Sequence, residues 1–216
     1  VWYAQMRKAV EAQLDGSGLH RPAIAKAILL GNKQALTSNE KASFAGSGTM
    51  HVLAVSGLHV GLVYLLLLGL LRPFFSKKSK SMIFLILAGI WLYASLSSFA
   101  PSVKRASLML SFLLIGQLLS RKIDVYNAVF LSALLLLFFS PHSIYGVGFQ
   151  LSYSAVLGLV TFYPSLYKRI SLRSKFLQKI WSLLCLSLVA QVSTMPLVLY
   201  YFHQFPSYFL LANLFV

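Results

Sequence analysis

Long apolar stretches alternate with short polar ones along most of this chain. About 20 apolar residues, at 1.5 Å of helical rise each, are enough to cross the hydrocarbon core of a bilayer. The pattern predicts spanning helices at 50–71, 82–100, 105–119, 125–139, 146–163 and 180–202, and a seventh that begins at 207. The third and fourth are short, so we expect them to thin the bilayer or to extend through their polar ends.

Residues 1–49 have a different pattern. One helical stripe predicts an amphipathic helix, formed by Val1, Trp2, Met6, Val10 and Leu14. The run from Asp15 to Gly18 breaks it, and Pro22 can begin a second short helix that Gly31 ends. We therefore expect two parts. Amphipathic helices in 1–49 lie on the membrane surface or cover the mouth of the bundle, and 50–216 forms a polytopic transmembrane module.

Composition supports this fold class, an all-α integral membrane protein with a helical bundle of about six to seven spans. Hydrophobic residues make up 58% of the 216 residues, and charged residues only 11%. A soluble domain has about a quarter of its residues charged. The single cysteine, Cys185, excludes an intrachain disulfide. Both ends of the chain look cut, as in a segment of a longer protein.

The basic residues predict the orientation. Connections 72–80, 120–124 and 164–179 carry 11 Lys and Arg, whereas 101–105, 140–145 and 203–206 carry 2. The positive-inside rule places the first set in the cytoplasm. This orientation leaves 1–49 outside despite its six basic residues, which is a real tension because acids count little in that rule.

The first predicted span carries unusual polar residues. His51 and His59 are eight apart, or about 80° around a helix, and Ser56 lies about 60° beyond His59. Gly57 and Gly61 lie on the opposite side and would let another helix approach closely. The polar side chains could form interhelical hydrogen bonds, line a polar passage or perform chemistry. The histidines lack the partners at i+3 or i+4 that a metal site needs.

Ser56-Gly57 near a histidine resembles the Ser-Gly core of rhomboid intramembrane proteases, so a hydrolase using Ser56 is an alternative. Those enzymes take the histidine from another helix. Here His142 and His203 fall in predicted connections on the outer side, and Ala54 replaces a glycine two residues before the serine. This resemblance covers only a few residues.

Other polar residues mark further spans. Lys104 and Arg105 lie on the predicted outer side, where they could snorkel to headgroups or face an aqueous vestibule that meets phosphates. Gln150 and Ser152 make the fifth span too polar to face lipid, so we expect it inside the bundle or re-entrant. Gln191 interrupts the sixth span, together with Thr194 and Pro196.

Five sequence runs together resemble the ComEC competence family, whose members form the inner-membrane channel for transforming DNA. The matching runs are ASFAGSGTMHVLAVSGLHVGLV (42–63), LLGNKQAL (29–36), PSVKRASLM (101–109), GFQLSYSAVLG within 141–158, and QVSTMPLVLYYFHQFPSYFLLANL (191–214). The resemblance covers almost the whole chain. It implies import of single-stranded DNA across the bacterial cytoplasmic membrane, with the OB-like and metallo-β-lactamase-like domains of full-length members lying outside this segment.

The resemblance and the residues together set the functional expectations. The segment would be a channel, with no catalytic residues, metal or cofactor of its own. Channel-lining or DNA-contacting candidates are His51, Ser56, His59, Lys104, Arg105, Gln150, Ser152 and Gln191. The expected partners are single-stranded DNA, membrane lipid, a cytoplasmic ATP-driven DNA translocase and a DNA receptor on the outer side. One chain or a homodimer could enclose the pore, and transport of another solute remains an alternative.

Overall fold

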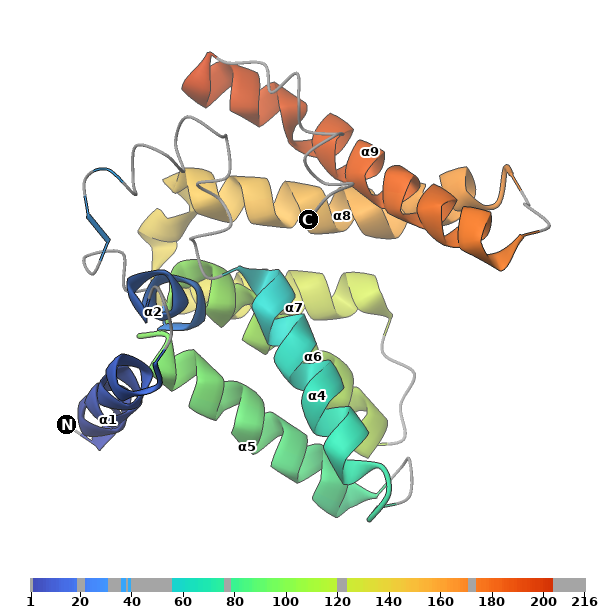
Figure 1. Ribbon diagram of the computed structural model, residues 1–216. Coiled ribbons are helices and arrows are strands. Elements are labelled where there is room, and N and C mark those ends of the chain that lie inside the picture. The colour runs from blue at the N-terminus through green and yellow to red at the C-terminus, as the bar shows by residue number, and fades with distance from the viewer. Residues whose placement is uncertain are drawn as a thin grey trace. The chain divides into compact units, whose positions relative to one another are not determined.

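The computed structural model is helical throughout the residues that it describes, which are 2–18, 22–30, 36–37, 39, 56–75, 79–119, 124–170 and 174–203. Its elements follow in chain order (Figure 1), and they are α1 (Trp2–Gly16), α2 (Pro22–Leu30), α4 (Gly57–Leu71), α5 (Lys80–Leu96), α6 (Pro101–Leu118), α7 (Val125–Phe139), η2 (Pro141–Tyr145), α8 (Val147–Tyr167) and α9 (Lys175–Phe202). The chain divides into two compact units, Val1–Ile123 (unit 1) and Asp124–Val216 (unit 2).

Unit 1 is built on α4, α5 and α6, which all contact one another. Their apolar core is centred on fully buried branched side chains, namely Val60, Ile86, Ile90 and Val103. The helices α4 and α6 begin at the end of the unit where α5 finishes (Figure 1). We call this end, formed by the first turns of α4 and α6 and the last turn of α5, the Lys104–Arg105 end.

The amphipathic helix α1 packs against α5 and against α2. The guanidinium of Arg7 donates to the hydroxyl of Ser98, just after α5, and Lys26 Nζ lies 2.6 Å from the Asp15 carboxylate. The bounds of α1 and α2 agree with the two helices predicted before residue 31. The Arg7–Ser98 bond places α1 near the Lys104–Arg105 end. The expected boundary at residue 49 lies outside the described residues.

Unit 2 consists of α7, η2, α8 and α9, with α8 contacting both other long helices. A Cβ on Gly158 of α8 would lie 2.5 Å from the Cβ of Ser193 on α9, so the two helices approach very closely there. The hydroxyl of Ser154 donates to the Ser193 carbonyl at 2.5 Å. The helix α8 is continuous over its 21 residues, with Pro164 in its last turn.

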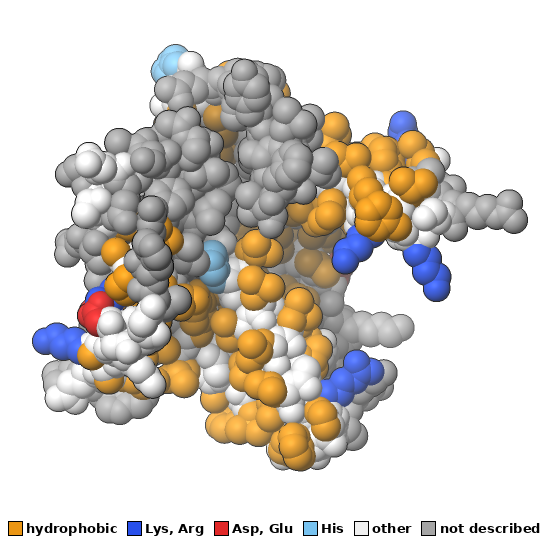
Figure 2. Space-filling model, viewed as in Figure 1, with side chains coloured by type: hydrophobic (Ala, Val, Ile, Leu, Met, Phe, Trp, Pro, Cys, Tyr) orange, Lys and Arg blue, Asp and Glu red, His pale blue; other side chains and the backbone are white. Residues whose placement is uncertain are grey.

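Apolar side chains cover much of the outside of both units. On α4, five leucines project outward and are 55–70% exposed, namely Leu58, Leu62, Leu65, Leu66 and Leu70. Figure 2 shows hydrophobic side chains spread over the visible face of α4 and α9. In contrast, Ser107 and Ser132 are completely buried. Exposed apolar patches with polar groups inside indicate an environment of lipid or of a large apolar partner.

The helices match the predicted spans with shifted ends. The helix at 125–139 is as predicted. In contrast, α5 begins two residues and ends four residues earlier than expected, and α6 begins four residues earlier, at 101. The helix α8 ends at 167 instead of 163, and α9 begins at 175 instead of 180. Within the described residues, α9 is long and apolar enough by itself to cross a bilayer, while α4, α5 and α7 are apolar but shorter. The all-helical class is confirmed. The count of six to seven spans stays a prediction. The seventh predicted span, from 207, lies outside the described residues.

Candidate functional site

The Lys104–Arg105 end of unit 1 gathers the largest share of the predicted polar residues. A turn joins α5 to α6, in which Ser98 and Phe99 both have left-handed φ values of 53° and 52°. Pro101 then occupies the first turn of α6, where a fixed φ and a missing N–H are favourable. Lys104 and Arg105 consequently lie inside the helix, in its first two turns, and the helix begins four residues before the predicted start at 105.

Lys104 and Arg105 differ sharply in their surroundings. Lys104 is exposed, and its Nζ lies 5.9 Å from the centroid of the Phe99 ring, a cation–π distance. The side chain of Arg105 is buried, with only 8% of the residue exposed. A guanidinium remains protonated in proteins, so this end of unit 1 contains a permanent positive charge within the bundle.

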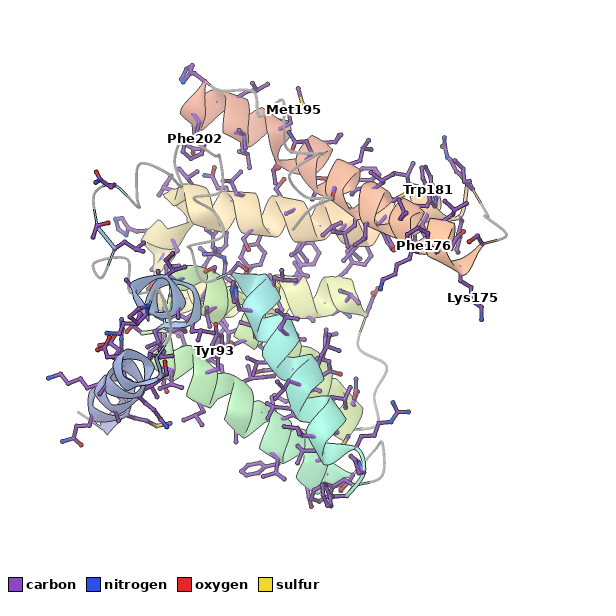
Figure 3. The ribbon with its side chains drawn as sticks, in the orientation of Figure 1. Tyr93, Lys175, Phe176, Trp181, Met195 and Phe202 are labelled. Carbon is purple, nitrogen blue, oxygen red and sulfur yellow. The ribbon has the colours of Figure 1, made fainter. Side chains whose placement is uncertain are left out.

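Further polar groups lie deeper between α5 and α6. The hydroxyls of Tyr93 on α5 (Figure 3) and Ser107 on α6 are buried and make no hydrogen bond to a described residue. One turn further along, Trp91 Nε1 donates to Ser111 Oγ at 3.1 Å, and that hydroxyl donates to the Ser107 carbonyl at 2.7 Å. Buried hydroxyls without a protein partner are costly, so these two positions are unusual polar sites within an apolar core.

Ser56 and His59 form a local pair at the start of α4. The backbone N–H of Ser56 donates to His59 Nδ1 at 3.2 Å, and Ser56 Oγ lies 3.0 Å from the same nitrogen. Ser56 is the N-cap of α4 with extended backbone (φ −112°, ψ 169°), so the helical-wheel position that we predicted for it was wrong. Its hydrogen bonds to His59 are those of a helix start.

The glycines of α4 place this pair beside α6. A Cβ on Gly57 would lie 3.3 Å from the Cβ of Ala106, next to Arg105 in the chain. By contrast, a Cβ on Gly61 would meet no described atom within 4 Å. The structure thus brings Ser56, His59, Lys104 and Arg105 to one end of unit 1. His51 lies outside the described residues.

The predicted residues of unit 2 are more dispersed. Gln150 Nε2 donates to the Ile144 carbonyl at 2.9 Å and thereby ties the start of α8 to η2. Ser152 on α8 and Gln191 on α9 are both half-buried. These three side chains are not hydrogen-bonded to one another in the described part of the chain, although the Ser154–Ser193 hydrogen bond places α8 beside α9 near the level of Gln191.

Several polar residues were missed by sequence reasoning. The fully buried Ser107 and Ser132, and the hydroxyl of Tyr93, belong to this group. One signal was available, because Ser107 and Ser111 are four residues apart and therefore share a face of the helix. In the described ranges, no three His, Cys, Asp or Glu side chains gather as a metal site would require.

Comparison of the sequence with known proteins identifies a family. Residues 28–216 match the model of a family described as competence protein. ComE operon protein 3 of Bacillus subtilis (strain 168) is 32% identical over 182 residues, which are 84% of this chain and 22% of that protein. An uncharacterized protein of Aquifex aeolicus (strain VF5) is 39% identical over 140 residues, 64% of this chain and 32% of that protein.

The chain spans about a fifth to a third of the length of these relatives. No solved structure matches it. The family match nevertheless covers most of the chain and includes every predicted site residue. The chain therefore belongs to the competence protein family.

Proposed function

We propose that this segment is a channel module that passes single-stranded DNA across the bacterial cytoplasmic membrane during natural competence. Membership of the competence family supports a role in DNA uptake. The observation that carries the channel itself is Arg105, a buried positive charge at one end of a bundle whose outside is largely apolar. A polyanion needs such a charge on its path and not on the lipid-facing surface.

The proposal treats α4 to α9 as six membrane crossings, with a seventh from 207. At 1.5 Å per residue, α4 and α7 are about 22 Å long and α8 is about 32 Å long, against a hydrocarbon core of about 30 Å. The shorter helices can be accommodated by local thinning. The outward leucines of α4 supply the lipid-facing surface that this arrangement requires.

Translocation of DNA requires a continuous polar wall, because each phosphate carries a charge that hydrocarbon will not accept. The buried hydroxyls of Tyr93 and Ser107 are suited to such a wall, since in the described protein they have no hydrogen-bond partner. Ser56 and His59 lie at the same end of unit 1 as Arg105. The remaining candidates for the wall are His51, Gln150, Ser152 and Gln191.

Import of an anion also needs an energy source. A membrane potential that is negative inside opposes entry by about 2.3 kcal/mol per charge per 100 mV. The sequence contains no Gly-rich Lys-Ser/Thr loop for nucleotide phosphates. We therefore propose that this segment has no enzymatic activity of its own. A cytoplasmic ATP-driven translocase would pull the strand after an outer DNA receptor delivers it, through a monomer or a homodimer.

Substitution of Lys104 and Arg105 in the full-length protein tests the proposal. We expect Lys104→Gln/Arg105→Gln to reduce transformation and to leave labelled DNA outside the membrane, because the phosphates lose their positive partners. Arg105→Lys should retain part of the activity, since it keeps the charge but loses the planar fork. Both readouts are normalised to the amount of protein in the membrane, measured by immunoblot.

Lys80→Gln is the matched control, because Lys80 is an exposed residue in the first turn of α5, at the other end of the same unit. The full-length protein with Lys80→Gln should take up DNA as wild type does. Full uptake by the Lys104→Gln/Arg105→Gln protein at normal membrane levels would contradict the channel proposal, and would favour another solute as cargo.

A hydrolase is the second candidate because Ser56 Oγ lies 3.0 Å from His59 Nδ1, a distance suited to proton transfer from a nucleophile. The backbone N–H of Ser56 also donates to the same nitrogen, which favours the capping role. Ser56→Ala would abolish turnover of a reporter substrate and leave DNA uptake intact if the hydrolase were correct. Loss of neither activity would leave Ser56 as a helix cap alone.

A further inference from the structure

A groove of about 260 Å³ opens between α4, α5 and α6 at the end of unit 1 opposite to Lys104 and Arg105. Its walls are mainly apolar and are formed by Tyr64, Leu68, Met82, Ile83, Ile86 and Leu114. Two polar side chains complete the lining, Arg72 and Gln117. The groove therefore combines a long apolar surface with one cation and one amide.

Both polar groups lie at the same end of this groove. Arg72 is the C-cap of α4, and Gln117 is in the last turn of α6. Met82, in the first turn of α5, lies at that level too. This end adjoins the connection 72–80, which is one of the three basic connections that the charge pattern assigns to the cytoplasm.

Unit 2 contains a second groove of the same kind. It also measures about 260 Å³, lies between α8 and α9, and has apolar walls of Phe162, Leu166, Leu188, Val189 and Val192. Arg169 lines it two residues beyond the end of α8, together with Ser165 and Ser193. This arginine belongs to the basic connection 164–179. Two separately packed units thus present an apolar groove that finishes at one arginine.

The lining of each groove defines the ligand. Among the described residues, no acidic side chain lines either groove, so each arginine offers a positive charge to an anion. The planar guanidinium suits a phosphate, to which it can donate two parallel hydrogen bonds. The apolar walls suit a hydrocarbon chain and would be a poor surface for a polyanion. Basic pockets between membrane helices on the cytoplasmic side are known to bind anionic headgroups.

We propose that each groove binds one anionic phospholipid of the cytoplasmic leaflet. The headgroup phosphate contacts Arg72 in unit 1 and Arg169 in unit 2, and the first part of an acyl chain lies along the apolar walls. This proposal rests on the membrane placement proposed above, but not on DNA as the cargo. Bound lipids would fill the spaces between helices that protein side chains leave open.

Native mass spectrometry of the full-length protein tests this binding. The protein is purified in detergent, exchanged into mixed micelles with palmitoyl-oleoyl phosphatidylglycerol or phosphatidylcholine, and compared as wild type, Arg72→Gln, Arg169→Gln and the double variant. We expect one retained phosphatidylglycerol fewer for each single variant and two fewer for the double variant. The affinity at each site should fall about fivefold, which corresponds to about 1 kcal/mol for one basic residue.

Lys80→Gln and Lys168→Gln are the matched controls. Both lysines are exposed in the same two basic connections, but neither lines a groove. They should retain as many lipids as wild type. Equal retention of the two lipids, or an unchanged phosphatidylglycerol count in the double variant, would overturn the proposal.

A second variant guards against loss of folding. Leu68→Trp fills the groove of unit 1 while keeping Arg72, and it should remove one lipid with the same thermal unfolding temperature as wild type. The membrane fraction of cells separates the two proposals. A protein absent from that fraction contradicts the membrane placement, whereas a membrane-inserted protein with an unchanged lipid count contradicts the lipid sites alone.

Discussion

At the scale of single residues, small side chains and buried hydroxyls determine how closely the helices of this protein pack. Membrane helices gain little from the hydrophobic effect among themselves, so close backbone approach and interhelical hydrogen bonds carry much of their association. In unit 2, Gly158 lies against Ser193, and the Ser132 hydroxyl lies 3.0 Å from that of Tyr153. Two predictions belong to this scale.

Gly158→Ala is expected to destabilise unit 2. The new Cβ would overlap both heavy atoms of the Ser193 side chain, so the helices must separate. Overpacking costs about 1–3 kcal/mol, and the gain in helix propensity is about 1 kcal/mol, so we expect a net loss of up to about 2 kcal/mol. The measurement is the thermal unfolding temperature of the detergent-purified protein. Adding Ser193→Gly should restore it.

Gly61→Ala is the control for this substitution, because a Cβ at Gly61 meets no described atom within 4 Å. Its unfolding temperature should equal or exceed that of wild type. If Gly158→Ala were as stable as Gly61→Ala, the close approach of α8 and α9 would be contradicted.

Tyr153→Phe is expected to lose one interhelical hydrogen bond. Ser132 uses its only hydroxyl proton on the Val129 carbonyl at 2.7 Å, so the Tyr153 hydroxyl is the donor between the two side chains. Such bonds in membrane proteins contribute about 0.6–1.7 kcal/mol. A double-mutant cycle with Ser132→Ala measures the coupling. Tyr145→Phe, at an exposed tyrosine, should change nothing.

At the scale of elements, the ends of the helices are set by short polar signals. Asp124 accepts a hydrogen bond from the Tyr126 backbone N–H at the start of α7, and Pro101 begins α6. Ser56 performs the corresponding role for α4 through His59. These ends matter for function because the starts of α4 and α6 carry Ser56, His59, Lys104 and Arg105.

Ser56→Ala is expected to destabilise the start of α4 by about 1 kcal/mol, the usual cost of losing an N-cap. Ser56→Asn keeps a capping oxygen without adding charge and should preserve both stability and DNA uptake, although it removes any serine nucleophile. Stability is measured by thermal unfolding, and uptake by transformation frequency. Loss of a hydrolytic activity in both variants, with stability retained in Ser56→Asn, would instead favour catalysis by Ser56.

At the scale of the whole molecule, the distribution of charge and apolar surface predicts how the chain crosses the membrane. Exposed apolar side chains extend over α4, α7 and α9, whereas basic residues concentrate in three connections. If α4 to α9 make the six proposed crossings, the connection at η2 lies outside and those before α5 and α9 lie inside. In that arrangement α1 also lies on the outer side, because Arg7 of α1 donates to the hydroxyl of Ser98, just after α5.

Cysteine labelling in intact cells checks this topology. In a full-length protein without native cysteines, His142→Cys is expected to react with a membrane-impermeant maleimide, while Lys80→Cys and Lys175→Cys react only after the cells are opened. All three positions are exposed in the structure, so unequal labelling reports the side of the membrane. Labelling of Lys80→Cys in intact cells would contradict the assigned orientation.

The helical class and the approximate places of the helices were predictable from sequence, because apolar run length and helix-breaking residues are local properties. The helix at 125–139 was placed correctly, since Asp124 and the apolar run define it fully. The start of α6 was placed four residues late, at 105, although Pro101 carries a signal that favours the first turn of a helix. The family also followed from sequence, since its runs occur in order.

What only the tertiary structure decided is which polar residues lie together. Sequence spacing relates residues on one helix, whereas contacts between helices depend on crossing angle and depth, which no local pattern specifies. The pairing of Gly57 with Ala106 and of Gly158 with Ser193 therefore required the packed units. The same packing buried Arg105 and left its neighbour Lys104 exposed, because adjacent residues project about 100° apart around a helix and therefore have different surroundings.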